Sequence, residues 1–149
     1  MLIIRKATKD DRHDLVAFNQ AMALETEGKQ LDEAVLTKGV SAVFDDLTKG
    51  FYVVAEESGT IIGGLMVTTE WSDWRNGWFW WIQSVFIRPE GRGRGIYRML
   101  YQFVKDRAAE NGNVCGFRLY VENENTNAQA VYEKLGMEKT YYLMYEEMN

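Results

Sequence analysis

Apolar residues recur along this chain with two periods, and the change of period divides it into helices and strands. Leu15, Phe18 and Met22 have the spacing of one helix face. They predict a first helix that begins after the capping-box pattern of Thr8 to Asp11. A second helix is predicted over 31–46. Its buried stripe is expected to consist of Leu36, Val40, Val43 and Leu47.

Two more helices are predicted in the second half of the chain. One begins at Ile96, carries an apolar face through Val104 and is broken at Asn111–Asn113. The other is short and ends at Gly136, which suits a left-handed helix cap. Its apolar face consists of Ala128, Val131, Tyr132 and Leu135.

Stretches rich in β-branched and aromatic residues predict the strands. They cover Leu2–Arg5, Phe51–Ala55, Thr60–Thr68, Trp78–Ile87, Val114–Val121 and Met137–Glu146. Ser58-Gly59 has the character of a hairpin turn. The order of elements predicts an α/β (mixed α+β) fold with a mixed, mostly antiparallel central sheet, flanked by about four helices.

Composition narrows the class of protein. With 149 residues, 46% of them hydrophobic and 26% charged, the chain is expected to form one globular domain over 1–149. No apolar run approaches a membrane span, and the start lacks the layout of a signal peptide, so a cytoplasmic protein without membrane contact is expected. The net charge of −5 argues against nucleic-acid binding. A single cysteine, Cys115, and a single histidine, His13, leave no disulfide and no cluster for a metal.

The five tryptophans lie within eleven positions. They are Trp71, Trp74, Trp78, Trp80 and Trp81. We expect Trp80 and Trp81 to lie in the core. Trp71 and Trp74 are expected at an acceptor site or an interface, so a homodimer stays open.

A glycine-rich segment between a strand and a helix carries the strongest chemical signal. From Arg88 to Arg98 the chain has four arginines against only Glu90, a local charge of +3. Glycine amides and a helix N-terminus together favour an anion. The segment is not a P-loop, since Gly95 is followed by Ile96, and a dinucleotide fingerprint fails at Arg98. The competing interpretation is a turn with solvated arginines.

The segment from Val85 to Ile96 resembles the acetyl-CoA signature of the GNAT superfamily of N-acetyltransferases. An apolar strand and Pro89 precede Arg92-x-x-Gly95, although Tyr97 stands where the family usually has Gly or Ala. A second stretch, Asn125 to Gly136, is similar to the family's Asn-x-x-Ala-x-x-x-Tyr-Glu-Lys-x-Gly motif. The resemblance implies a single GNAT-like domain, acetyl-CoA as co-substrate and no metal.

The resemblance also implies roles for individual residues. Pantetheine is expected on the strand backbone at Val85, Phe86 and Ile87. The pyrophosphate is expected on the loop, at Arg92, Gly93, Arg94, Gly95, Ile96 and Tyr97. Asn125 would contact the cofactor or only cap its helix, and Tyr132 would serve as the acid at the leaving thiolate.

The general base is where this sequence departs from the family. Some members carry a carboxylate on the strand before the glycine loop, whereas Trp81 and Gln83 occupy the inward positions here. Glu70, on the neighbouring strand, and Glu25, at the end of the first helix, are the candidates, with Glu70 preferred. The competing interpretation is that both only attract a cationic acceptor.

Two functions follow from the sequence. The first is an acetyl-CoA-dependent transfer of an acetyl group to a primary amine, on a small molecule or a peptide, by direct attack in a ternary complex. The alternative is a non-catalytic GNAT-fold module that binds CoA or acyl-CoA as a sensor or interaction domain.

Overall fold

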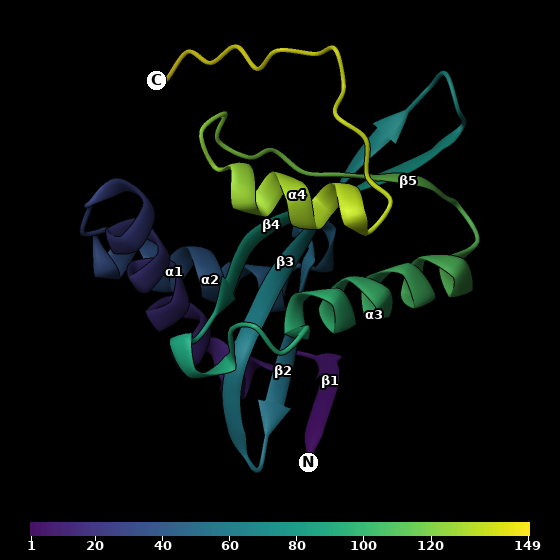
Figure 1. The fold of residues 1–149 in the computed structure, drawn as a ribbon. Helices are drawn as coiled ribbons and strands as arrows, with labels where there is room; N and C mark the ends of the chain where they lie inside the picture. The colour runs from purple at the N-terminus through teal and green to yellow at the C-terminus, as the bar shows by residue number, and fades with distance from the viewer. The chain divides into compact units, whose positions relative to one another are not determined.

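The computed structural model describes residues 1–149 and confirms most of the expected elements. Helices α1 (Arg12–Glu27), α2 (Glu33–Asp45), α3 (Ile96–Asn111) and α4 (Thr126–Lys134) accompany five strands (Figure 1). The strands are β1 (Leu2–Lys6), β2 (Phe51–Glu57), β3 (Thr60–Ser72), β4 (Gly77–Ile87) and β5 (Val114–Arg118). Short 3₁₀ turns lie at Lys9–Asp11, Leu47–Lys49 and Pro89–Gly91.

The strands form one sheet in the order β1-β2-β3-β4-β5. The strands from β1 to β4 pair with one another antiparallel, and β5 runs parallel to β4. The predicted mixed, mostly antiparallel sheet is therefore confirmed. The chain divides into two compact units, Met1–Leu119 with the whole sheet and Tyr120–Asn149 with α4.

Both faces of the sheet are covered within the first unit. One face packs on α1 and α2, where Leu15, Phe18 and Val40 meet Val54 and Phe86. The alternate residues of β2 and β3 point to the opposite face. The side chains on that face are almost wholly buried. The side chains on the inner side of α3 are buried in the same way. They are Val53, Leu65, Val67, Leu100 and Val104.

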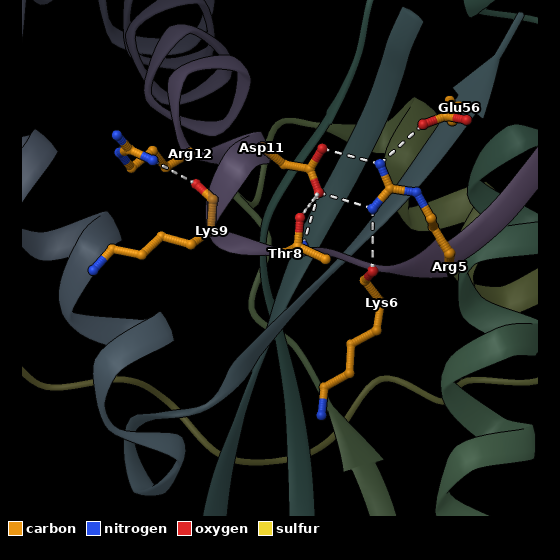
Figure 2. Close-up of polar contacts among 7 residues, drawn as sticks. All are labelled: Arg5, Lys6, Thr8, Lys9, Asp11, Arg12 and Glu56. Atoms are coloured by element: carbon orange, nitrogen blue, oxygen red, sulfur yellow. Dashed lines mark hydrogen bonds and ion pairs between the residues drawn. The ribbon is translucent and has the colours of Figure 1, made fainter. Parts of the chain in front are cut away.

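A part-buried ionic cluster ties the first strand to the start of α1 (Figure 2). Arg5 donates to both carboxylate oxygens of Asp11, at 2.8 and 3.0 Å, and to Glu56 on β2 at 2.9 Å. Asp11 also accepts from the Thr8 backbone N–H at 2.8 Å, and its capping box with Thr8 is the predicted one. Hydrogen bonding from Arg5 lowers the pKa of Asp11 below its ordinary 3.8, although burial opposes this shift.

The chain departs from the sequence-based expectation at four places. The predicted strand Met137–Glu146 is wrong, because that segment is in no strand. β5 ends at Arg118 rather than Val121, since its pairing with β4 stops at Trp81. Leu47 lies in a 3₁₀ turn after α2 and is 74% exposed. Cys115, a small residue within a predicted strand, is expected to be buried, but it is exposed.

Two further properties of the fold concern membranes and metals. No helix of the structure is both long and apolar enough to cross a bilayer. No three His, Cys, Asp or Glu side chains are grouped so that they could hold a metal ion.

Candidate acetyl-CoA site

β4 has an open edge after its first residues. On one side it pairs with β3 from Gly77 to Ile87, whereas on the other it pairs with β5 only from Trp78 to Trp81. From Ile82 onward the N–H and C=O groups on that second side face no strand. Such an edge can hydrogen-bond an extended ligand.

A bulge lies in the middle of this open edge. Gly64 pairs with Phe86 and Met66 pairs with Gln83, so two residues of β4 oppose Leu65 alone. Ser84, inside the bulge, has φ of 51°, which is rare for a residue with a side chain. A bulge bends its strand, and here it lies just beyond the last residue that pairs with β5.

The glycine loop that follows has two kinds of glycine. Gly93 and Gly95 both have φ of 74°, and a Cβ at either would meet no atom within 4 Å. Gly91 is packed instead, since a Cβ there would lie 3.1 Å from Ile87 Cγ2 and 3.2 Å from Ile96 Cδ1. Gly91 therefore serves packing, whereas Gly93 and Gly95 set the turn and leave room beside the backbone for a ligand.

The loop ends at the N-terminus of α3. Gly95 is the N-cap and offers no side chain to the first amides of the helix. Met99 N–H bonds to Gly95 C=O at 3.2 Å, so the amides of Ile96 and Arg98 have no acceptor within the helix. Tyr97, the departure from the family pattern, stacks on Tyr101 one turn further along α3, with ring centroids 6.2 Å apart. Its side chain is thereby held against the helix.

The arginines of the loop are already paired with carboxylates. Arg88 pairs with Asp14, Arg92 with Glu25 and Arg94 with Glu57. Hydrogen bonding between Arg94 and Glu57 lowers the pKa of the carboxyl and raises that of the guanidinium. The local positive charge expected from the sequence is therefore largely compensated, and an anion would depend mainly on backbone amides.

Arg92 also occupies part of the predicted strand contact. Its Nε donates to the Ile87 carbonyl at 2.9 Å, while its Nη2 donates to both oxygens of Glu25 at 2.9 and 3.1 Å. Phe86 points into the core, where its ring lies 5.1 Å from that of Phe18. The Phe86 side chain is therefore not available to a ligand, and Arg92 competes for the Ile87 carbonyl.

Glu70 lies at the other end of β4 from the glycine loop. It faces Phe79 across β3 and β4, and its Oε1 accepts from Trp81 Nε1 at 3.0 Å and from Arg118 Nη1 at 2.9 Å. Oε2 takes part in neither bond. The Arg118 guanidinium also lies 3.6 Å from the centroid of the Phe79 ring. The carboxylate on β3 is therefore held by side chains from β4 and β5.

The two candidate bases thus lie in different environments. Glu25 is bonded through both oxygens to the loop expected to hold the pyrophosphate. Glu70 is bonded through one oxygen, and one of its donors is Trp81, a position that the sequence marks as inward. Gln83 donates to Thr68 at 2.6 Å on the same strand pair.

The tryptophans differ in how far their side chains are buried. Trp80 is buried, as expected, and its ring meets that of Phe51 at 5.3 Å. Trp81 is only half-buried and bonds to Glu70, so its assignment to the core is wrong. Trp71 and Trp74 are exposed, and Trp71 packs edge-on against Trp78 at 5.0 Å. Their role stays a prediction.

The second unit carries the remaining motif residues. Asn125 caps α4, because its side chain accepts from Ala128 N–H at 3.1 Å. Tyr132 is half-buried on α4, and burial raises the pKa of its phenol. Gly136 has φ of 102°, as its predicted left-handed cap requires. The cofactor contact of Asn125 and the acid role of Tyr132 stay predictions.

Two features of the site were not predicted from the sequence. The bulge at Ser84 results from the register between β3 and β4. This register is known only once the two strands are paired. Arg118 was visible as a charge on a predicted strand, but its partner Glu70 is 48 residues away. A cation placed on an otherwise apolar strand is the signal that could have marked it.

Comparisons with known proteins agree with this geometry. Residues 18–137 match the model of the acetyltransferase (GNAT) family. A Bacillus subtilis protein described as an uncharacterized N-acetyltransferase, YhfO, is 30% identical over 87 residues; these are 58% of this chain and 58% of that protein.

Solved structures extend the likeness over the whole chain. A possible acetyltransferase from Clostridium difficile 630 is 46% identical, with a TM-score of 0.92 over 100% of this chain and 98% of that one. A predicted acetyltransferase from Clostridium acetobutylicum, solved with acetyl-CoA, shares the fold at 20% identity, with a TM-score of 0.80 over 99% and 96% of the two chains. The family match, the relatives and the open strand edge with its glycine loop lead to one conclusion: the chain belongs to the acetyltransferase (GNAT) family.

Proposed function

We propose that residues 1–149 act as one N-acetyltransferase domain that moves the acetyl group of acetyl-CoA to a primary amine, by direct attack within a ternary complex. The observation that carries this proposal is the open edge of β4, which continues through the Ser84 bulge into the glycine loop. The edge suits an extended amide-bearing chain, and the loop suits a pyrophosphate. The C. acetobutylicum structure with acetyl-CoA has the same fold.

Two segments of this chain would bind different parts of acetyl-CoA. The backbone of Val85 to Ile87 would pair with the pantetheine amides once Arg92 releases the Ile87 carbonyl. Amides of the loop from Arg92 to Tyr97 would hold the pyrophosphate, supported by the positive end of the α3 dipole. Acetyl-CoA supplies a thioester: the amine nitrogen bonds to its carbonyl carbon, and the carbon–sulfur bond breaks.

Tyr132 would donate a hydrogen bond to the departing sulfur. A phenol with pKa near 10 and a thiol near 8.5 make full proton transfer uphill by about 2 kcal/mol. Burial raises the pKa of Tyr132 further. The group is therefore better suited to stabilising the developing thiolate than to delivering its proton, and the proton would follow from solvent.

Glu70 is the better candidate for removing the proton of the amine. The thioester lies at the far end of the cofactor from the pyrophosphate, so a base tied to the pyrophosphate loop, as Glu25 is, lies at the wrong end. Glu70 keeps Oε2 outside its two hydrogen bonds and can bind a water there. Glu25 would instead position Arg92.

Turnover with a panel of amines tests the function. The protein is incubated with acetyl-CoA and polyamines, aminoglycosides, amino acid derivatives and peptides, and free thiol is followed. Amine-dependent thiol release is expected, with kcat lowered about 10²–10⁴-fold in Tyr132→Phe at unchanged KM for acetyl-CoA. Tight acetyl-CoA binding without turnover on any amine would instead favour the sensor or interaction module.

The pH–rate profile then separates the two carboxylates. Glu70→Gln should flatten or shift the acidic limb of kcat, because a true base must be deprotonated to act. Glu25→Gln is the matched control and should change binding without altering that limb. If both variants change only the KM of the amine, both residues are binding groups.

A further inference from the structure

The Glu70 carboxylate is exposed enough to move, yet one of its oxygens is held by two donors. The side chain lies near the end of β3 and is 45% exposed. A long side chain in water ordinarily samples several rotamers. Here Oε1 accepts from Trp81 Nε1 at 3.0 Å and from Arg118 Nη1 at 2.9 Å. Two donors that converge on one oxygen restrict the orientation of the carboxylate and leave Oε2 outside both bonds.

The groups around this carboxylate lie on one face of the sheet. Glu70 is in register with Phe79 across β3 and β4. Across β4 and β5, Phe79 is in register with Gly116. In the same strand pair, Trp81 is in register with Arg118. Residues opposite one another share a face, as do residues two positions apart along a strand. Three strands therefore bring these five residues together on the same side.

Arg118 is itself held in place by an aromatic ring. Its guanidinium carbon lies 3.6 Å from the centroid of the Phe79 ring. At this distance a cation is attracted to the face of an aromatic ring. Phe79 is buried, so its ring is a fixed platform for the guanidinium. Arg118 therefore presents Nη1 to Glu70 from a restricted position.

The Phe79 ring can lie where it does because residue 116 is a glycine. A Cβ at Gly116 would lie 2.8 Å from Cε1 and 3.1 Å from Cδ1 of the ring. A buried ring is closely packed and has little room to move away. The supports thus act in series: Gly116 makes room for Phe79, Phe79 holds Arg118, and Arg118 holds the carboxylate.

This arrangement contributes more to orientation than to stability. The side chains of Arg118 and Glu70 are 28% and 45% exposed. Ion pairs with this degree of exposure contribute little to the free energy of unfolding. Arg118 also compensates the charge of Glu70, which weakens the attraction of the carboxylate for a cationic acceptor. What the pair does supply is one carboxylate oxygen in a fixed place.

We infer that Arg118 is a positioning residue for Glu70, with Phe79 and Gly116 as its support. Arg118 acts through Oε1 alone, so that Oε2 stays available to the water through which the amine would lose its proton. The inference rests on the proposed role of Glu70 as the base. It adds residues of β4 and β5 that lie outside the glycine loop and outside the second family motif.

Steady-state kinetics with an amine acceptor test the inference. Arg118→Met keeps an apolar contact with Phe79 but removes the charge and the donor. It should lower kcat at least about tenfold, which is part of the 10²–10⁴-fold that a general base contributes, at unchanged KM for acetyl-CoA. Arg118→Lys keeps a cationic donor and should recover part of the loss. In the Glu70→Gln background Arg118→Met should have no further effect, because the two residues act as a unit.

A matched control and a second variant sharpen this test. The guanidinium of Arg75 also lies over the Phe79 ring, at 5.1 Å, whereas the salt bridge of Glu70 is made by Arg118. Arg75→Met should therefore keep the wild-type kcat. Gly116→Ala displaces the ring without changing either charged residue and should lower kcat in the same direction as Arg118→Met.

The Trp81 indole N–H gives a measurement that does not need activity. It shares Oε1 with Arg118, so a carboxylate that becomes mobile in Arg118→Met should let this N–H exchange faster with water in NMR spectra. Arg75→Met should leave its exchange unchanged, and the loss of one indole signal in Trp81→Phe identifies it.

The outcomes separate this inference from the proposed function. If wild type releases no thiol with any amine, the acetyl transfer fails, and the indole exchange alone decides whether Arg118 holds the carboxylate. If wild type turns over, an undiminished kcat in Arg118→Met overturns the inference. So does an equal loss of kcat in the Glu70→Gln background, or an unchanged exchange of the Trp81 indole N–H.

Discussion

The arginine–carboxylate pairs of the Arg5 cluster and of the glycine loop differ in burial rather than in chemistry. Figure 2 shows the cluster of Arg5, Asp11 and Glu56. Its Asp11 side chain is only 9% exposed. In the glycine loop, Arg92 and Glu25 are 47% and 45% exposed. Buried charges must be paired, because an orphaned one is costly. Exposed pairs are worth little and open easily, which suits a loop that must receive an anion.

The largest expected effect is a loss of stability, which should be greater for a substitution in the Arg5 cluster than for one in the glycine loop. Asp11→Ala removes a buried partner of Arg5 and the acceptor of the Thr8 N–H in the capping box before α1, and should cost about 2–3 kcal/mol of unfolding free energy. Glu25→Ala should cost less than about 0.5 kcal/mol. Urea unfolding of both variants measures the difference. Equal losses would mean that burial does not distinguish the two regions.

The next effect concerns cofactor binding at the loop. Gly95→Val places a β-branched residue at φ of 74° and fills the space beside the backbone, so CoA affinity should fall about tenfold or more. Arg94→Ala should weaken CoA less, because that guanidinium already pairs with Glu57.

Gly112→Val is the matched control for this experiment. Gly112 has φ of 80°, caps the far end of α3 and also has open space around it, so the backbone strain is similar. It should lower stability like Gly95→Val while leaving CoA affinity unchanged in a calorimetric titration. Equal losses of affinity in both variants would remove the glycine loop as the site.

The smallest effect is the acid dependence of stability. The folded pKa of Asp11 lies below its ordinary 3.8. Its contribution is therefore complete above pH 3.8 and is lost as the pH falls through the folded value. Unfolding measured between about pH 2 and 5 should show a shallower loss in Asp11→Asn than in wild type. The difference should survive added KCl, since part-buried pairs are screened weakly, and its disappearance in salt would contradict the assignment.

Local patterns in the sequence were sufficient for most elements. The capping box at Thr8, the helix faces of α1 and α3, the β2–β3 hairpin and the glycine loop depend on neighbours within a few residues. The family motifs are local in the same sense, and the family they predicted is confirmed. Periodicity of side chains and backbone freedom are properties that a short stretch of chain carries with it.

The tertiary structure decided what depends on distant partners. The bulge at Ser84 depends on the register between β3 and β4. The compensation of the loop charge comes from Asp14, Glu25 and Glu57, which are distant in sequence. The segment 137–146 has a strand pattern but no strand, because backbone hydrogen bonds between strands need a second strand in place, and no local pattern supplies one.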